Sequence, residues 1–134
     1  MKTLFIIPLV LMSLVSSPSW ALSEDDLVIR AGLYYEKFTA TPVTGEVDEG
    51  VSKGSIKNGK MEGYWVISGL MLIQKGNYKN GKKEGSWETY WANGQLMLKG
   101  TYKNDKREGS WESYHKDGQL EGTGTYKNDV KVSD

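Results

Sequence analysis

The stretches YKNGKKEGSW at residues 78–87 and YKNDKREGSW at residues 102–111 decide the fold of this chain. These ten-residue segments are nearly identical and lie 24 positions apart, and the same glycine and tryptophan stand at the end of each. Recurrence at a fixed period of roughly 20 to 50 residues is typical of proteins built from stacked structural units. The architecture of the chain must therefore be worked out from the repeat before any catalytic motif is considered.

Working outward from these copies, the repeats run over residues 54–75, 76–99 and 100–123, with a partial unit at 124–134. A more degenerate copy, GEVDEGVSK, precedes them at residues 45–53. Aromatic residues and glycines recur in register across the units. We expect these recurring positions to form the structural core of the repeats: Trp65, Trp87, Trp111, Tyr78, Tyr102, Tyr126, Gly85 and Gly109.

Turn signals divide each repeat into two strands. Asn80-Gly81, Asn93-Gly94 and Asp117-Gly118 are strong hairpin signals, because these residues tolerate the positive φ that tight turns require. The intervening stretches are rich in Trp, Tyr, Thr and Leu, which favour strands. The sequence therefore predicts an all-β protein, in which each repeat is a β-hairpin and successive hairpins pair into an elongated antiparallel sheet.

Side-chain alternation agrees with strands that are half exposed to water, with one mainly apolar face and one mostly polar face. Leu96, Leu98, Gly100 and Tyr102 share one parity, and mostly polar residues occupy the other. We expect each tryptophan to lie across a glycine of a neighbouring strand, where a missing Cβ leaves room for the ring. A lone hairpin is marginal in water, so stability must come from stacked neighbours. Residues 22–52 are predicted to cap the array through Leu27, Ile29, Leu33 and Tyr35.

The N-terminus predicts export. Residues 1–21 contain Lys2, an apolar run and then a small-residue site in which Ser19 and Ala21 precede a cleavage point, as in a secretory signal peptide. The apolar run is shorter than the roughly 20 residues that span a bilayer. The chain has no cysteine, so neither a lipoprotein anchor nor a disulfide is available. We therefore expect a periplasmic or secreted protein.

Charge is balanced overall but divided along the chain. Residues 22–52 carry seven acids against two bases, and residues 53–134 carry fourteen bases against ten acids. Such halves attract different partners or one another. The positive excess of the second half is far below that of nucleic-acid-binding domains, so no nucleic-acid partner is expected.

The segments YKNGKKEGSWETYWANGQL and YKNDKREGSWESYHKDGQL resemble the MORN-repeat-variant family of bacterial proteins, and the preceding GLYYEKFTATPVTGEV resembles the element that often comes before such repeats. The resemblance implies a curved, single-layer sheet of hairpins that acts as a scaffold or adaptor. It also implies a proposed association with membrane surfaces. Some family members are labelled antitoxins, a cytoplasmic role that a signal peptide contradicts here.

Residues with catalytic chemistry are better explained by the repeat. His115 occupies the slot that Trp91 holds one repeat earlier, and no cysteine accompanies it as a metal ligand. Glu84 with Glu88, and Glu108 with Glu112, could imitate the paired carboxylates of a glycosidase, but they recur as surface positions of hairpins. We expect no enzyme, no cofactor and no metal site. Calcium stays a weaker alternative, with these acids as candidate ligands: Asp25, Asp26, Asp48 and Glu49.

Two surfaces remain as candidate sites for a partner. The first is a basic edge along successive turns, formed by Lys60, Lys82, Lys83, Lys106 and Arg107. The second is an aromatic face formed by Tyr64, Tyr90, Trp91 and Tyr114. The sequence thus favours a binding or scaffold module for a protein partner. Anionic membrane or a cell-envelope glycan is the alternative ligand, and a solvated edge that discourages sheet-to-sheet association is the other explanation of the basic turns.

Overall fold

The computed structural model describes residues 21–48 and 52–134. The predicted signal peptide lies outside the described residues, except for Ala21. The elements are η1 (Glu24–Asp26), β1 (Leu27–Arg30), β2 (Leu33–Glu36), β3 (Gly45–Asp48), β4 (Lys53–Lys57), β5 (Lys60–Ser68), β6 (Leu72–Lys79), β7 (Lys82–Trp91), β8 (Leu96–Lys103), β9 (Lys106–Tyr114), β10 (Leu120–Lys127) and β11 (Val130–Ser133). None of the described helices is long and apolar enough to cross a membrane.

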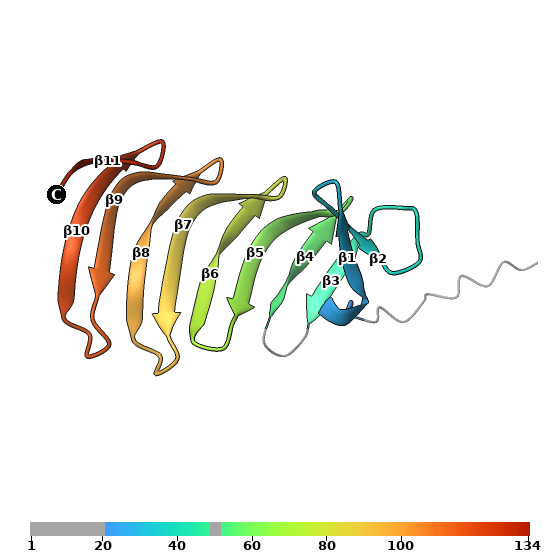
Figure 1. The fold of residues 1–134 in the computed structure, drawn as a ribbon, viewed down its shortest axis with the longest axis horizontal. Helices are drawn as coiled ribbons and strands as arrows, with labels where there is room; N and C mark the ends of the chain where they lie inside the picture. The colour runs from blue at the N-terminus through green and yellow to red at the C-terminus, as the bar shows by residue number, and fades with distance from the viewer. Residues whose placement is uncertain (1–20, 49–51) are drawn as a thin grey trace, which may run out of the picture.

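Strands β3 to β11 form one antiparallel sheet in which the spatial order follows the order of the chain. Figure 1 shows these strands side by side in a single elongated layer, with hairpin β1–β2 lying across one end. The prediction of an all-β protein made of tandem hairpins in an open antiparallel sheet is confirmed.

Among the predicted turns, Asn80-Gly81 is a two-residue hairpin loop, whereas Asn93-Gly94 and Asp117-Gly118 lie in longer loops in which only the glycine of each pair has positive φ. Asn80 and Gly81 have φ of 51° and 77°, and Asn104 and Asp105 have φ of 49° and 67°. Positive φ at both central residues defines the type I′ turn, whose twist matches that of the flanking strands. These turns lie along one long edge of the sheet, at the top of Figure 1. We call this margin the turn edge; its turns are Asn58-Gly59, Asn80-Gly81, Asn104-Asp105 and Asn128-Asp129.

A β-bulge follows each of these turns. The register between β6 and β7 shifts between Gly76 and Asn77, and Gly85 lies opposite the shift with φ of 79°. Gly63 and Gly109 occupy the same place in the neighbouring repeats with φ of 71° and 74°. The recurring glycine before each tryptophan is therefore required by a left-handed backbone conformation, which glycine adopts without a steric penalty.

The N-terminal cap packs on the first repeat. Val43, Val47, Ile56 and Trp65 form a buried cluster, against which the partly buried residues Leu22, Leu27, Tyr34, Met61, Ile67 and Tyr78 pack. Register within the hairpin pairs Ile29 with Tyr34 and Val28 with Tyr35. Tyr34 rather than the expected Tyr35 therefore faces the sheet, because the pairing puts Tyr34 and Ile29 on the inner side of the hairpin.

Candidate binding surface

Six aromatic rings form a continuous row across one face of the nine-stranded sheet. Tryptophan and tyrosine alternate, each ring meets the next edge to face, and the centroid separations lie between 5.0 and 6.4 Å. In order, the rings are Trp65, Tyr78, Trp87, Tyr102, Trp111 and Tyr126. Edge-to-face pairs stabilise beyond the area they bury. We call this side of the sheet the ladder face.

Each tryptophan of the row lies on a glycine of the preceding strand, as the sequence predicts. A Cβ added at Gly54, Gly76 or Gly100 would come within 2.1 to 2.3 Å of the ring of Trp65, Trp87 or Trp111, respectively. The indole Nε1 atoms of Trp65 and Trp87 donate to backbone oxygens at 3.1 Å. The three tryptophans keep only 3 to 4% of their surface exposed, and Tyr78, Tyr102 and Tyr126 are half-buried.

Two cations lie on the ladder face rather than along the turn edge. The Lys83 Nζ is 4.2 Å from the Trp87 ring centroid and 5.1 Å from that of Tyr102. The Arg107 guanidinium is 4.2 Å from the ring of Tyr126 and 6.0 Å from that of Trp111. Both side chains are half-buried. Strand pairing places them there, since Lys83 lies opposite Tyr78 and Arg107 opposite Tyr102, and directly paired residues share one face of the sheet.

The Lys83 ammonium lies in a partly desolvated environment. Burial lowers its pKa, and the nearby Asp105 carboxylate opposes that shift. Its Nζ donates to the Gln74 Oε1 at 3.1 Å. Within the described ranges no carboxylate lies at ion-pairing distance from this ammonium, whereas Arg107 Nε is 3.6 Å from Asp129. Lys83 is therefore a cation whose charge the fold leaves largely uncompensated.

At the turn edge the acids join neighbouring repeats. The carboxylates of Glu62, Glu84 and Glu108 accept hydrogen bonds of 2.9 to 3.0 Å from backbone N–H groups of the next asparagine turn. Asp105 likewise accepts from the Lys83 backbone N–H at 2.7 Å. Lys60, Lys82 and Lys106 are exposed at the same edge. The basic residues expected to share one edge thus divide between the turn edge and the ladder face.

The tyrosines of the expected aromatic face lie on the other side of the sheet. The Tyr90 hydroxyl donates to Glu88 at 2.5 Å, which raises the pKa of Tyr90 to about 12, and Tyr114 donates to Glu112. Lys75 Nζ is 4.8 Å from the Tyr90 ring. Tyr64 belongs to the same face and is 58% exposed. We call this side the opposite face.

Strand register gives the opposite face a row of alternating charge. Lys75 pairs with Glu88, Glu88 with Lys99, and Lys99 with Glu112. Lys99 Nζ is 2.8 Å from a Glu112 oxygen, and this contact lowers the pKa of the carboxyl and raises the pKa of the lysine. Because each carboxylate has a cation or a phenol beside it, this face is nearly neutral.

The remaining candidates lie at the ends of the strands away from the turn edge. Trp91 donates from its Nε1 to the Tyr114 backbone oxygen at 3.3 Å, and the Lys116 ammonium lies 5.1 Å from its ring centroid. His115 takes the corresponding place in the next repeat, with its Nδ1 3.9 Å from Glu121 and its side chain 55% exposed. Trp91 thus connects the loop that follows β7 to the loop that follows β9.

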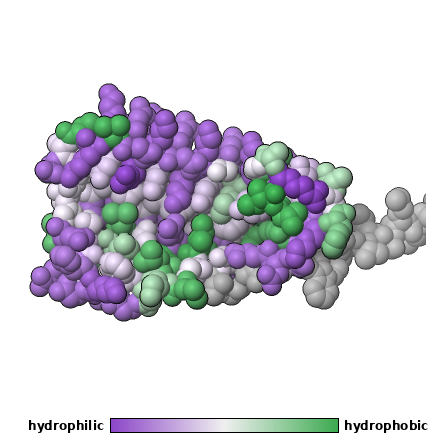
Figure 2. All heavy atoms as spheres, viewed as in Figure 1, coloured by the Kyte–Doolittle hydropathy of each residue, from purple (hydrophilic) through white to green (hydrophobic). Residues whose placement is uncertain are grey.

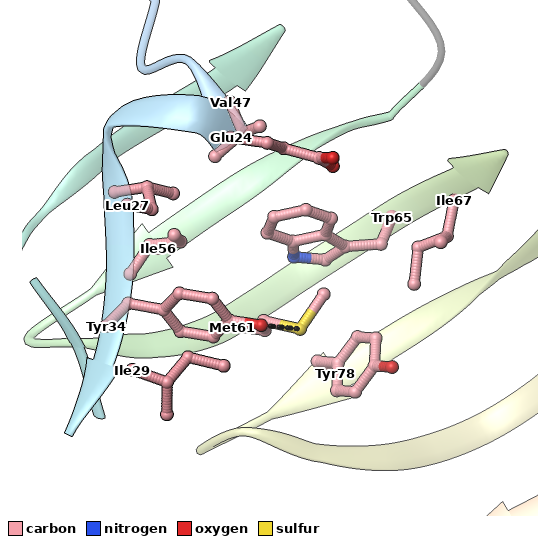
Figure 3. A pocket seen from close by; sticks show the side chains of 10 residues that line it. All are labelled: Glu24, Leu27, Ile29, Tyr34, Val47, Ile56, Met61, Trp65, Ile67 and Tyr78. Carbon is pink, nitrogen blue, oxygen red and sulfur yellow. Dashed lines mark hydrogen bonds between the residues drawn. The ribbon is translucent and has the colours of Figure 1, made fainter. Parts of the chain in front are cut away.

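A cavity of about 420 Å³ lies between the cap and the ladder face. Figure 3 shows Leu27, Ile29 and Tyr34 of hairpin β1–β2 on one side and Met61, Trp65, Ile67 and Tyr78 of the sheet on the other. The Tyr34 hydroxyl points at the Met61 sulfur, 3.9 Å away. Its walls are mainly apolar and aromatic, and Glu24 also lines it. The local sequence does not predict this cavity, because it forms between segments more than 20 residues apart.

The described part of the chain contains no group of three or more His, Asp or Glu residues arranged to hold a metal ion. Among the calcium ligands considered, Glu49 lies outside the described residues, and Asp48 forms an ion pair with Lys53 at 3.1 Å. Glu84 lies at the turn edge and Glu88 on the opposite face, each with its own partner.

The fold and the ladder face define a class of protein: an open array of β-hairpin repeats stacked through aromatic residues. The family model described as the MORN repeat variant matches residues 83–104 and 107–128, so the chain carries repeats of this kind and the resemblance is confirmed. Each match begins at a ladder-face cation and runs through two strands to the next asparagine turn. No curated protein matches the sequence. MORN repeats are generally binding or scaffold modules and are typically non-enzymatic.

Proposed function

We propose that this chain is a non-enzymatic binding module. It docks a protein partner on the part of its ladder face that hairpin β1–β2 leaves uncovered. One observation carries the proposal. The hairpin covers the ladder face over the first repeat, whereas over β6 to β11 no other described element packs on that face. Figure 2 views this side, with purple residues along the turn edge and pale and green residues below them.

Charge supports the choice of this face over the opposite one. On the opposite face Lys99 and Glu112 neutralise each other at 2.8 Å. On the ladder face the ammonium of Lys83 faces aromatic rings and an amide. A half-desolvated cation that has no described carboxylate at ion-pairing distance favours an anionic group supplied from outside, because that group recovers Coulomb energy at little further desolvation cost.

We further propose that the module acts outside the cytoplasm, in the periplasm or as a secreted protein. The support is the signal-peptide pattern of residues 1–21. A neutralising antitoxin would act in the cytoplasm, so that role is the less favoured one. A hydrolase is also less favoured, because the recurring carboxylates already serve the fold as hydrogen-bond acceptors.

The test is capture of a partner from a cell-envelope extract on the immobilised chain residues 22–134, followed by mass spectrometry. The variant K83M/R107M removes both ladder-face charges while retaining apolar stems over the rings, as Met61 does naturally in the first repeat. The matched control K75M/K99M changes two lysines of the opposite face. We expect K83M/R107M to lose the partner and K75M/K99M to retain it; the reverse pattern would exclude the ladder face.

A second candidate function is supported by the turn edge. Lys60, Lys82 and Lys106 have no ion pair with any described residue, and the acids beside them are engaged by backbone N–H groups. Such an exposed row of lysines fits phosphate head groups of an anionic membrane. Salt-sensitive binding to vesicles containing phosphatidylglycerol, lost in K82E/K106E and kept in K83M/R107M, would favour this function over protein docking. Retention on purified cell wall instead would favour a glycan.

A further inference from the structure

Three consecutive repeats present the same position to the ladder face with different chemistry. Met61, Lys83 and Arg107 are each the second residue after an asparagine turn, on β5, β7 and β9. Lys83 lies over the rings of Trp87 and Tyr102, and Arg107 over those of Trp111 and Tyr126. Met61 lines the cap cavity together with Trp65 and Tyr78. Equivalent positions are two strands apart in a continuous sheet, which corresponds to about 9.6 Å. The face therefore carries an apolar site and two cationic sites in a row at nearly equal spacing.

The apolar site is the cavity beneath the cap. Met61 lines it together with Trp65 and Tyr78, and the hairpin residues Leu27 and Tyr34 close the far side. Its volume of about 420 Å³ lies in the range of pockets that bury a small ligand, so one leucine or phenylalanine side chain fits. The cavity opens on the same face of the sheet that carries Lys83 one repeat further along.

We propose that the ladder face takes an acidic peptide segment of the partner in the polyproline II conformation, with an apolar side chain in the cap cavity and carboxylates three and six residues away on Lys83 and Arg107. This inference rests on the proposed function and specifies the chemistry of the partner. What selects this occupant is the order of the sites along a single row, one apolar site followed by two cationic sites, rather than the general charge of the face.

The spacing decides the conformation. A polyproline II helix has three residues per turn and a rise of about 3.1 Å, so every third side chain falls on one face at about 9.3 Å. An α-helix returns to one face every seven residues, at about 10.5 Å. A β-strand repeats every second residue, at about 6.7 Å. Over three sites the polyproline II segment drifts from the row by about 0.6 Å and the α-helix by about 1.8 Å, so the former fits best.

The two cations are suited to carboxylates. Lys83 has no carboxylate at ion-pairing distance among the residues described, and burial lowers its pKa, so a bound carboxylate relieves an unfavourable state. The Arg107 guanidinium contacts Asp129 through Nε at 3.6 Å, and it has further N–H groups for bidentate binding. Polyproline II segments also lose little conformational entropy on binding beside aromatic residues.

The experiment measures binding of fluorescent peptides to residues 22–134 by anisotropy at low salt. The matched peptides are LPPEPPE and its reverse EPPEPPL, which cover both chain directions. The control peptide LEPEPPP has the same composition with a different spacing. We expect one matched peptide to bind at least tenfold more tightly than the control, and K83M/R107M to lose that preference while K75M/K99M keeps it.

A variant that is expected to gain a new peptide preference tests the inference without relying on a loss of binding. M61K places a third cation at the apolar site, and we expect it to prefer EPPEPPE over LPPEPPE. Far-ultraviolet circular dichroism confirms that each variant is folded. Equal binding of matched and control peptides, or binding that K83M/R107M leaves unchanged, overturns the inference. If no peptide binds while an envelope protein is still captured in a manner that requires Lys83 and Arg107, the inference is wrong and the proposed function stands.

Discussion

At the residue scale, the repeat depends on a tryptophan that lies flat on a glycine. Gly54, Gly76 and Gly100 leave no room for a Cβ beneath the rings above them. The alternation of Leu96, Leu98, Gly100 and Tyr102 predicts this contact from the sequence, because it puts the glycine on the apolar side of the strand. The contact explains why a single sheet layer can bury large aromatic side chains.

Gly100→Ala tests the contact directly. Its Cβ would lie 2.1 Å from the Trp111 ring, so the ring must move, and we expect a loss of about 2 to 3 kcal/mol in the free energy of unfolding. Gly122→Ala is the control, since its Cβ would be 3.6 Å from the Ser113 hydroxyl, an ordinary contact. Urea unfolding followed by tryptophan fluorescence measures both. Equal effects of the two substitutions would contradict the packing described.

Tyr78 gives the fold a dependence on alkaline pH. Burial is the largest cause that raises the pKa of its hydroxyl from 10.0 to about 12. An unfolded tyrosine releases its proton near pH 10, so the stability linked to Tyr78 is fully present below pH 10 and is lost as the pH rises to about 12. Burial raises the pKa of Tyr102 as well, whereas the lowered pKa of Lys83 acts in the opposite direction.

The measurement is urea unfolding at pH 9 and pH 11 for the wild type and Tyr78→Phe. We expect the wild type to lose more stability between these two values than Tyr78→Phe, because phenylalanine has no proton to release. An identical loss in both proteins would show that the Tyr78 hydroxyl does not titrate as the structure indicates.

Grouping the basic residues by their turn misplaces Lys83 and Arg107, which stand beside Lys82 and Lys106 in the sequence. Neighbouring residues of a strand point to opposite faces, and pairing with Tyr78 and Tyr102 puts Lys83 and Arg107 on the ladder face. Lys83 shares its parity with Trp87, and Arg107 with Trp111, so strand alternation in the sequence already carries this signal.

At the element scale, each hairpin is joined to the next by its turn as well as by its strands. A glutamate of one repeat accepts a hydrogen bond from the asparagine N–H of the next turn, and an aspartate returns a second bond to the preceding repeat. The letters K-x-E-G therefore encode a connection between repeats. The sequence predicts the hairpins from their turn residues, but the role of the glutamate becomes evident only when two repeats are seen side by side.

Glu84→Ala removes one such connection. Its carboxylate accepts from the Asn104 N–H at 2.9 Å, and we expect a loss of about 1 kcal/mol in the free energy of unfolding. The neighbouring exposed residue Lys82 serves as control, and Lys82→Ala is expected to change stability by less than about 0.5 kcal/mol. Hydrogen exchange of the Asn104 amide reports the lost bond; unchanged protection in Glu84→Ala would contradict the assignment.

Gly85→Ala tests the bulge that re-aims the following strand. No atom lies within 4 Å of the added Cβ, so the cost comes only from φ of 79°. A left-handed conformation costs a non-glycine residue about 1 to 2 kcal/mol, and we expect that loss in chemical denaturation. A neutral effect would show that the bulge has no left-handed residue in solution.

The sequence predicts which residues form the N-terminal cap, but not which face of hairpin β1–β2 packs on the sheet. Leu27 and Ile29 were expected to cover an open face, and they line the cap cavity. The choice between Tyr34 and Tyr35 follows from the pairing of β1 with β2, which a sequence with two adjacent tyrosines does not specify. The cavity itself depends on how the hairpin crosses the sheet, and such long-range packing cannot be predicted from the local sequence.

At the scale of the whole molecule, the chain is a strip of sheet with three distinct surfaces. The ladder face carries rings, a cavity and the cations Lys83 and Arg107, of which Arg107 is paired with Asp129; the opposite face is nearly neutral, and the turn edge carries exposed lysines. The sequence predicts two surfaces, a basic edge and an aromatic face, whereas the structure distributes these lysines and aromatic residues over more than two. Tyr64, Tyr90 and Tyr114 lie on the opposite face, away from the cations that a partner is expected to meet on the ladder face.

Lysine footprinting of the complex with the captured envelope protein distinguishes these surfaces in one measurement. Acetylation followed by mass spectrometry reports each lysine separately: Lys83 for the ladder face, Lys75 and Lys99 for the opposite face, and Lys82 and Lys106 for the turn edge. The account predicts that the partner protects Lys83 and leaves the other four as reactive as in the free chain. Protection of Lys75 and Lys99, with Lys83 unchanged, would contradict it.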